Sequence, residues 1–241
     1  SAALQTTYPA TIKGIQDVEV RPKVSGFITK VFVHEGQTVS AGQALFSIDS
    51  ETYQAAVRSA AAAVNTAKAQ ANTAKLTYQN NKKLYDSKII GEYELSTAAN
   101  GYATAKAQVA QAEAALASAR EQLAWCTVTS PSAGVVGSLP FKVGALVSAS
   151  GQALTTVSNI STMEVFFSLS ESQILSMSKT NGSVQAAIAA FPAVKLQLAD
   201  GSIYNHPGKV VKMSGVIDAT SGSISLIAHF ANPEKLLKSG G

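Results

Sequence analysis

The side chains that could act as nucleophiles or metal ligands are few in this chain and lie far apart. Cys126 is the only cysteine, so the chain can form neither an internal disulfide nor a zinc site built on thiolates. His34, His206 and His229 are isolated from one another, and the three methionines are scattered. Cys126 lies in the segment WCTVTSP, which is typical of a strand that enters the second repeat, and we interpret it as a small buried hydrophobic residue. These residues predict no catalytic nucleophile and no metal site.

Sequence motifs for catalysis are also missing. No glycine-rich phosphate loop precedes a helical pattern, and no GxSxG motif is present. The carboxylates occur where solvation, helix capping or a turn explains them; Asp49 fits a helix start, and Asp200 with Gly201 is a hairpin-turn signal. We therefore predict that the protein is not an enzyme and holds no cofactor.

The composition narrows the remaining classes of function. The net charge is only +4, and no basic cluster alternates with aromatic residues, so we expect no nucleic-acid partner. No run of about 18 apolar residues is present, so we predict no membrane-spanning helix. The first residues do not form a signal peptide, and we expect any targeting signal to lie outside this sequence.

An internal repeat organises the chain. The segment SGFITKVFVHEGQTVSAGQAL, which starts at Ser25, returns as AGVVGSLPFKVGALVSASGQAL from Ala133. Both copies alternate apolar with small or polar residues, as half-buried strands do. One copy is too small to be stable alone, so we predict that residues 23–50 and 125–158 form one β-sandwich. We assign the turns of this sandwich to six aligned glycines: Gly26 with Gly134, Gly36 with Gly144, and Gly42 with Gly151.

The segment 51–124 between the repeats predicts an antiparallel helical hairpin. It is rich in good helix formers, lacks proline, and has apolar or small residues at alternating steps of four and three. This spacing runs from Tyr53 to Tyr85 and again from Leu95 to Leu123, and DSKIIGEYE interrupts it. We therefore expect two helices of about 33 residues, each roughly 50 Å long, with the tip at 80–92.

Three lysines follow the hairpin at intervals of seven residues. Lys68, Lys75 and Lys82 flank the predicted contact line between the helices. Two interpretations of this stripe stay open. It is either a solvated face or a contact with a second copy of the protein.

The rest of the chain, 159–241, predicts a small antiparallel β-barrel. We expect a short helix from Glu171 to Ser178 and strands at 194–198, 202–204, 209–213 and 223–230. The predicted fold class is therefore α+β and multidomain: a lipoyl-like β-sandwich, split by a coiled-coil hairpin, precedes the barrel.

Several segments resemble the periplasmic adaptors, or membrane fusion proteins, of tripartite efflux pumps. VEVRPKVSGFITKVFVHEGQTVSAGQALFSIDSETYQAAV is similar to the first half of their lipoyl-like domain. LAWCTVTSPSAGVVGSLPFKVGALVSASGQALTTVSN is similar to the second half, although Trp125 and Cys126 stand where the family usually has Tyr and Thr. FFSLSESQIL and LADGSIYNHPGKVVKMSGVIDATSGSISLIAHFANPEKLL resemble the family's β-barrel domain.

The resemblance implies a non-enzymatic adaptor in the periplasm. It would link an inner-membrane transporter of the resistance-nodulation-division (RND) class to a TolC-type outer-membrane channel, with copies, commonly six, forming a funnel. An adaptor for an ABC-type exporter or for type I secretion is the alternative. The family pattern also implies that a membrane-proximal domain follows the barrel, that 1–22 belong to this region, and that an N-terminal lipid or signal anchors the protein. We expect this sequence to lack that domain and that anchor.

The repeat also resembles lipoyl and biotinyl carrier domains, which hold a modifiable lysine in the hairpin between their halves. Here Asp49, Ser50 and Glu51 lead directly into a helix, so we predict no covalent cofactor and no role as a carrier subunit.

RND-type adaptors often carry an R-x3-L-x6-S pattern at the hairpin tip. Counted from the leucine, this chain has Asn80, Leu84 and Gly91, so only the leucine matches. Two adjacent isoleucines at the predicted turn are unusual for a solvated loop, although they could also cap the hairpin core. We assign channel docking to the tip, in the order of expected importance Leu84, Ile89 and Ile90, then Lys83, Gly91 and Asn80.

Overall fold

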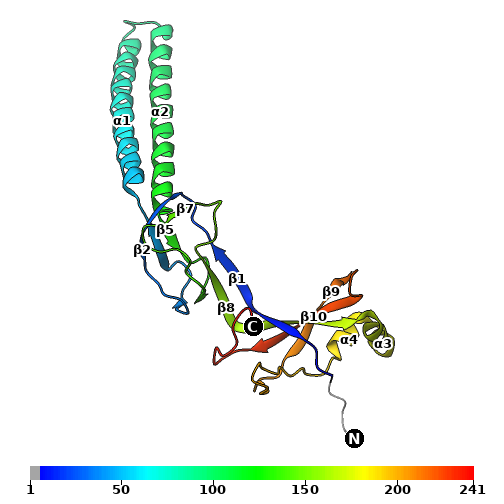
Figure 1. The fold of residues 1–241 in the computed structure, drawn as a ribbon. Coiled ribbons are helices and arrows are strands. Elements are labelled where there is room, and N and C mark those ends of the chain that lie inside the picture. The colour runs from blue at the N-terminus through cyan, green and yellow to red at the C-terminus, as the bar shows by residue number, and fades with distance from the viewer. Residues whose placement is uncertain (1–5) are drawn as a thin grey trace.

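The computed structural model describes residues 6–241, which form two β-rich bodies and a long helical hairpin (Figure 1). The hairpin projects from one end of the molecule, and the described N-terminal and C-terminal segments lie in the β-rich part. None of the helices in the described part of the chain has both the length and the hydrophobicity needed to cross a bilayer.

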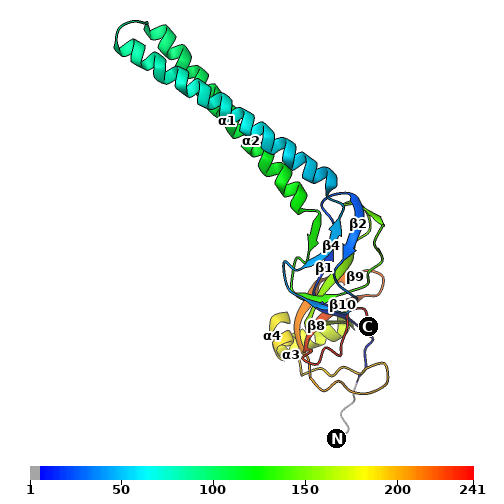
Figure 2. The same cartoon turned by 90° about the vertical axis from the view of Figure 1, so that its left-hand side faces the viewer.

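The hairpin consists of α1 (Glu51–Asp86) and α2 (Glu92–Ala124), which lie side by side in both views (Figures 1 and 2). At 1.5 Å per residue, the 36 residues of α1 span about 54 Å. Alanine, lysine, glutamine and glutamate favour helix at most positions. The positions with four-three spacing, from Tyr53 to Tyr85 and from Leu95 to Leu123, are buried or half-buried, with one exception. Tyr85 is exposed, and the neighbouring Leu84 is half-buried in its place.

The contact line between the helices is narrow because its residues are small. Its buried side chains are Val64, Ala67 and Ala71 on α1 and Ala105 on α2. One aromatic pair adds area, since the rings of Tyr78 and Tyr102 stack with their centroids 6.2 Å apart. Small side chains bury little apolar area per residue, so the hairpin gains less from its core than a leucine-rich hairpin would.

The two repeat copies exchange strands, and their side chains share one core. Gly26 pairs with Val147, and Gly134 pairs with Val39. These two pairs are equivalent in the repeat, so each copy contributes the same contact to the other. The shared core contains Ile28, Leu45 and Phe46 from the first copy and residues such as Leu154 from the second.

Antiparallel pairing organises all of the strands. Four form one sheet, in the order β5 (Thr127–Thr129), β4 (Ala44–Ile48), β2 (Gly26–Val31) and β7 (Leu146–Val147). Five follow one another in the second sheet, in the order β3 (Thr38–Val39), β6 (Gly134–Val136), β8 (Thr155–Ser170), β10 (Ser223–Ala231) and β9 (Lys209–Asp218). The sixth strand of the second sheet, β1 (Ala10–Val20), also pairs with β8.

Two paired strands, β8 and β1, run through both β-rich bodies and connect them. Val157 on β8 is buried in the first core, whereas Met163 on the same strand is buried in the second. The predicted boundary between residues 158 and 159 therefore falls inside β8. Its partner β1 also extends into both bodies, since Ile12 packs on the second core and Val20 lies in the first. Of the predicted N-terminal segment 1–22, residues 1–5 lie outside the described part.

The second β-rich body differs from the prediction in its irregular segment. The strands predicted at 194–198 and 202–204 are present only as single bridges, Val194 with Gly208 and Gln197 with Ile203. Pro192 and Pro207 flank this segment and lack the amide donor that a longer ladder needs. The turn itself is as predicted, with Gly201 at a φ of 84°.

Two helices precede this segment, where the sequence predicted one. α3 (Glu171–Asn181) begins at a capping box formed by Ser170 and Gln173, and Gly182 ends it with a φ of 85°. The second helix, α4 (Val184–Ala189), begins at Ser183, whose hydroxyl accepts a hydrogen bond from the Ala186 amide. A helix of six residues is too short for its hydrophobic period to be recognised in the sequence.

Candidate docking surfaces of the hairpin

The tip of the hairpin is a tight helix end with a non-glycine residue in the left-handed conformation. The Ile89 amide donates to the Leu84 carbonyl at 2.8 Å, and the Lys88 amide donates to the Tyr85 carbonyl at 2.8 Å. This pair of hydrogen bonds is the Schellman arrangement, whose penultimate residue is usually glycine. Here it is Lys88, with a φ of 59°. The tip is thus fixed by backbone hydrogen bonds rather than by a glycine turn.

Apolar side chains gather at this end of the hairpin. Ile89 is 68% exposed and Tyr93, in the first turn of α2, is 80% exposed. Leu84 and Ile90 are half-buried, so they face partly toward the hairpin and partly toward solvent. Neighbouring apolar side chains that remain exposed are typical of a surface that contacts a partner.

The other residues predicted to dock the channel are Asn80, Lys83 and Gly91, and none of them adds an apolar side chain to the turn. Asn80 and Lys83 are exposed on α1 before the loop, so the structure does not bring Asn80 to the turn. Gly91 is the N-cap of α2 with a φ of −85°, and its carbonyl accepts a hydrogen bond from the Leu95 amide at 3.4 Å. Sequence analysis missed Tyr93. The available signal was a large aromatic residue outside the four-three spacing, next to the predicted turn.

The three lysines of the stripe differ in whether they have an acidic partner. Lys68 forms an ion pair with Glu113 on α2, with 3.2 Å between Nζ and Oε1. Lys75 and Lys82 form no ion pair with any carboxylate within residues 6–241. The stripe therefore carries one neutralised lysine and two uncompensated ones.

Three of the six repeat glycines occupy turns that require glycine. Gly36, Gly42 and Gly144 have φ angles of 80°, 81° and 94°. Residues other than glycine rarely adopt this left-handed region, because their Cβ atom crowds the backbone. No atom lies within 4 Å of a Cβ built on any of the three, so conformation rather than space selects glycine here.

The remaining repeat glycines do not have this role, which corrects their assignment as turn residues. Gly26 and Gly134 lie within strands and are selected by close packing. A Cβ on Gly26 would lie 2.6 Å from Ile48 Cγ2, and one on Gly134 would lie 2.6 Å from the Ser158 carbonyl oxygen. Gly151 comes directly after a turn, and its own φ is not in the left-handed region.

Core packing or an ion pair accounts for the positions of Cys126, His206 and His229. Cys126 is buried in the first core, where burial, with a smaller effect of Asp49, raises the pKa of its thiol. A raised pKa disfavours the nucleophilic thiolate. His229 Nε2 lies 3.1 Å from Glu164 Oε1 across neighbouring strands, and His206 pairs with Glu234 at 3.1 Å.

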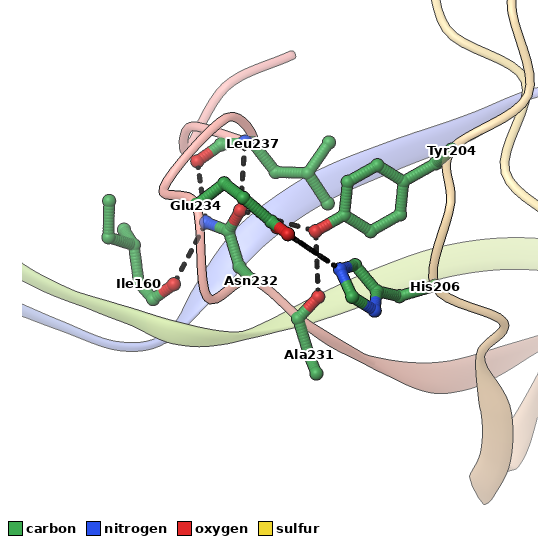
Figure 3. Close-up of polar contacts among 7 residues, drawn as sticks. All are labelled: Ile160, Tyr204, His206, Ala231, Asn232, Glu234 and Leu237. Carbon is green, nitrogen blue, oxygen red and sulfur yellow. Dashed lines mark hydrogen bonds and ion pairs between the residues drawn. The ribbon is translucent and has the colours of Figure 1, made fainter.

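A buried asparagine fastens the C-terminal segment to the junction between the two bodies (Figure 3). Asn232 is 1% exposed, and its amide nitrogen donates to the carbonyls of Ile160 and Leu237 at 2.9 Å each. Its side-chain oxygen accepts from the Leu237 amide at 3.0 Å. Three hydrogen bonds of one buried side chain therefore hold the C-terminal segment at the junction.

Tyr204 and His206 form further polar contacts with the C-terminal segment next to Asn232. The Tyr204 hydroxyl donates to the Ala231 carbonyl at 2.8 Å, and burial, with the Glu234 carboxylate adding to it, raises the pKa of the phenol. A hydrogen bond from His206 lowers the pKa of Glu234. Farther along the C-terminal segment, Lys235 Nζ donates to Thr38 Oγ1 at 3.4 Å and so connects it to the first body.

Comparison with known proteins places this architecture in one family. The model of the barrel-sandwich hybrid domain of RND membrane fusion proteins matches residues 16–159, and the model of their beta-barrel domain matches residues 162–240. The membrane fusion protein MtrC of Neisseria gonorrhoeae is 34% identical over 100% of this chain and 59% of its own length. The multidrug efflux pump subunit AcrA of Escherichia coli K12 is 34% identical over 98% of this chain and 60% of its own length.

Solved structures agree with this placement. A MacA–MexA chimeric protein that contains the Pseudomonas aeruginosa MexA α-hairpin domain superposes with a TM-score of 0.67 and 28% identity, over 96% of this chain and 74% of the other. The membrane fusion protein Spr0693 of Streptococcus pneumoniae R6 shares the fold, with a TM-score of 0.69 and 22% identity over 96% of each chain. The chain spans about three fifths of the length of the curated relatives named above. The chain belongs to the RND membrane fusion protein family.

Proposed function

We propose that this protein is a non-enzymatic periplasmic adaptor that links an inner-membrane RND transporter to a TolC-type outer-membrane channel for the efflux of drugs or other small molecules. The observation that carries the proposal is the consecutive match to both family domains over most of the chain. Relatives are named as efflux pump subunits or periplasmic linkers, among them the ArpA linker of a Pseudomonas putida antibiotic efflux pump. The narrow hairpin supports the same role, since a rod of about 54 Å spans distance at little mass.

Each part of the chain has a proposed task. Residues 23–50 and 125–158 form the lipoyl-like sandwich that fixes the root of the coiled-coil hairpin, 51–124. The barrel, 159–241, contacts the transporter together with the membrane-proximal region to which 1–22 contribute. The hairpin tip, 80–92, contacts the channel through Leu84, Ile89 and Ile90, and the exposed Tyr93 supports a contact surface that extends onto α2.

We further propose that copies of the protein assemble side by side, as a hexameric funnel in the complete pump. The flank that carries Lys68, Lys75 and Lys82 faces the neighbouring copy, where Lys75 and Lys82 are free to contact it. Two features support this arrangement: the thin alanine contact line between the helices gains little stability by itself, and two lysines of the flank have no acidic partner within residues 6–241.

Purification of the full-length protein from its native envelope tests the proposal. An affinity-tagged copy is expressed at its normal level, the membranes are solubilised in mild detergent, and the retained proteins are identified by mass spectrometry. We expect an RND transporter and an outer-membrane channel to be retained together. Retention of an ABC-type transporter instead would assign the protein to the alternative class, and retention of neither would contradict the adaptor role.

A further inference from the structure

The middle of the hairpin contains a basic groove between the two helices. It has a volume of about 240 Å³ and is lined by three lysines, an asparagine, a tyrosine and two apolar residues: Lys68, Ala71, Asn72, Lys75, Tyr102, Lys106 and Val109. Both helices contribute to it. The groove lies outside the tip to which channel docking is assigned, and two of its lysines, Lys68 and Lys75, also belong to the flank proposed to face a neighbouring copy.

The register of the hairpin places two of these lysines opposite each other. Lys68 on α1 pairs with Glu113 on α2. The helices are antiparallel, so one heptad forward on α1 and one heptad back on α2 bring Lys75 opposite Lys106. Such flanking positions usually carry opposite charges, as Lys68 and Glu113 do. The like-charged pair departs from this rule, and departures of this kind are expected at functional sites.

The structure gives this pair no internal compensation. The four ion pairs within residues 6–241 include neither Lys75 nor Lys106. Lys106 does not simply extend into solvent, because its ammonium group lies 4.4 Å from the centroid of the Tyr102 ring. A cation–π contact holds this charge beside the groove, which Tyr102 and Lys75 also line.

We propose that this groove binds a small multivalent oxyanion, carboxylate or phosphate in type, between Lys75 and Lys106. An anion with two or more charges contacts both ammonium groups at once and removes their mutual repulsion. The Asn72 amide is a further donor among the lining residues. Lys68 contributes less, because Glu113 already neutralises it. The bound anion joins α1 to α2 where their contact line consists of small residues and so stabilises the hairpin.

Calorimetric titration of the 241-residue protein with tripolyphosphate, and separately with citrate, tests the inference. Each titration is made against sodium chloride of matched ionic strength, because exposed charges are screened by salt. We expect saturable binding of about one anion per chain, with changes in the amide resonances of Asn72 and Tyr102. Lys75→Gln and Lys106→Gln each weaken the affinity about fivefold, as expected when one exposed charge contact is lost.

Two variants on the same hairpin separate a site from general charge attraction. Lys82→Gln removes an equal charge one heptad farther along, opposite Ala99 and outside the groove, and leaves the affinity unchanged. Lys106→Glu supplies an internal partner for Lys75 and abolishes binding. If Lys82→Gln weakens binding as much as Lys75→Gln does, or if Lys106→Glu binds as well as the wild type, the site is wrong. The absence of saturable binding by the wild-type chain also overturns it. Because these measurements use the isolated chain, they do not depend on pump assembly.

Discussion

The Ile89 amide donates a 2.8 Å hydrogen bond to the Leu84 carbonyl and so closes the end of α1. This bond joins Leu84 and Ile89, the first two of the residues to which channel docking is assigned. It fixes the backbone of the turn while the Ile89 side chain remains largely exposed. The tip therefore presents its apolar surface on a rigid support, which lowers the entropy lost when a partner binds.

Lys88→Gly is expected to stabilise the hairpin by about 1 kcal/mol. Lys88 adopts a φ of 59°, a conformation that costs a residue with a Cβ atom this much relative to glycine. Urea denaturation followed by circular dichroism at the helical minimum measures the change. Lys88→Ala is the control, since it removes the charge and keeps the strained Cβ. Equal stabilities of the glycine and alanine variants would show that strain at this residue is absent.

Glycine-to-alanine substitutions are expected to have opposite effects in the turns and in the hairpin. Gly36→Ala and Gly144→Ala each lose about 1–2 kcal/mol of unfolding free energy, because both turns need a positive φ. Gly101→Ala gains about 1 kcal/mol, because Gly101 lies inside α2 with no atom within 4 Å of an added Cβ. Thermal denaturation of the three variants checks the signs, and a stabilised Gly36→Ala variant would refute the assigned turn.

Asn232→Ala is expected to destabilise the junction by roughly 3 kcal/mol. The substitution leaves the carbonyls of Ile160 and Leu237 and the Leu237 amide without their partner. Chemical denaturation measures the loss, and Asn65→Ala on the exposed face of α1 serves as the control, with a change within about 0.5 kcal/mol. Similar small changes in both variants would mean that the Asn232 hydrogen bonds do not hold the segment.

Asp218 is expected to make stability depend on pH in the acid range. Hydrogen bonds from Thr220 and Ser221 lower its pKa from 3.8 to about 2. Because the pKa is lower in the folded state, its contribution is complete above the unfolded value and is lost as the pH falls through about 2. Asp218→Asn should therefore flatten the pH dependence of the unfolding free energy between about pH 5 and about pH 2. Parallel curves for variant and wild type would contradict the lowered pKa.

The repeat and the four-three spacing predicted the main architecture because each is a long-range pattern with many positions. The glycine alignment matched Gly26 with Gly134, and the structure places them in the equivalent pairs Gly26–Val147 and Gly134–Val39, which the alignment did not predict. The alignment also did not distinguish glycines selected by a positive φ, such as Gly36, from those selected by close packing, such as Gly26. That distinction depends on the approach of Ile48, a tertiary contact that no local pattern records.

The candidate docking and binding residues were harder to predict from the sequence than the architecture was. Leu84 was selected from a family pattern, yet its inward position depends on how the last turn of α1 closes at Lys88. The Lys75–Lys106 relationship required the register between the helices, which the spacing alone does not fix. It became visible only through the Lys68–Glu113 pair.

Drug efflux by cells whose only copy of the full-length protein carries Leu84→Asp decides the role of the tip. Docking would bury the carboxylate of Leu84→Asp without a partner, so the variant is expected to abolish efflux. The abundance of the protein and its retention of the transporter should stay at wild-type levels. Leu76→Asp is the control for an added charge on the same helix: Leu76 is 58% exposed and lies away from the tip, so this variant should leave efflux intact. Normal efflux by the Leu84→Asp variant at wild-type abundance would contradict docking through the hairpin tip.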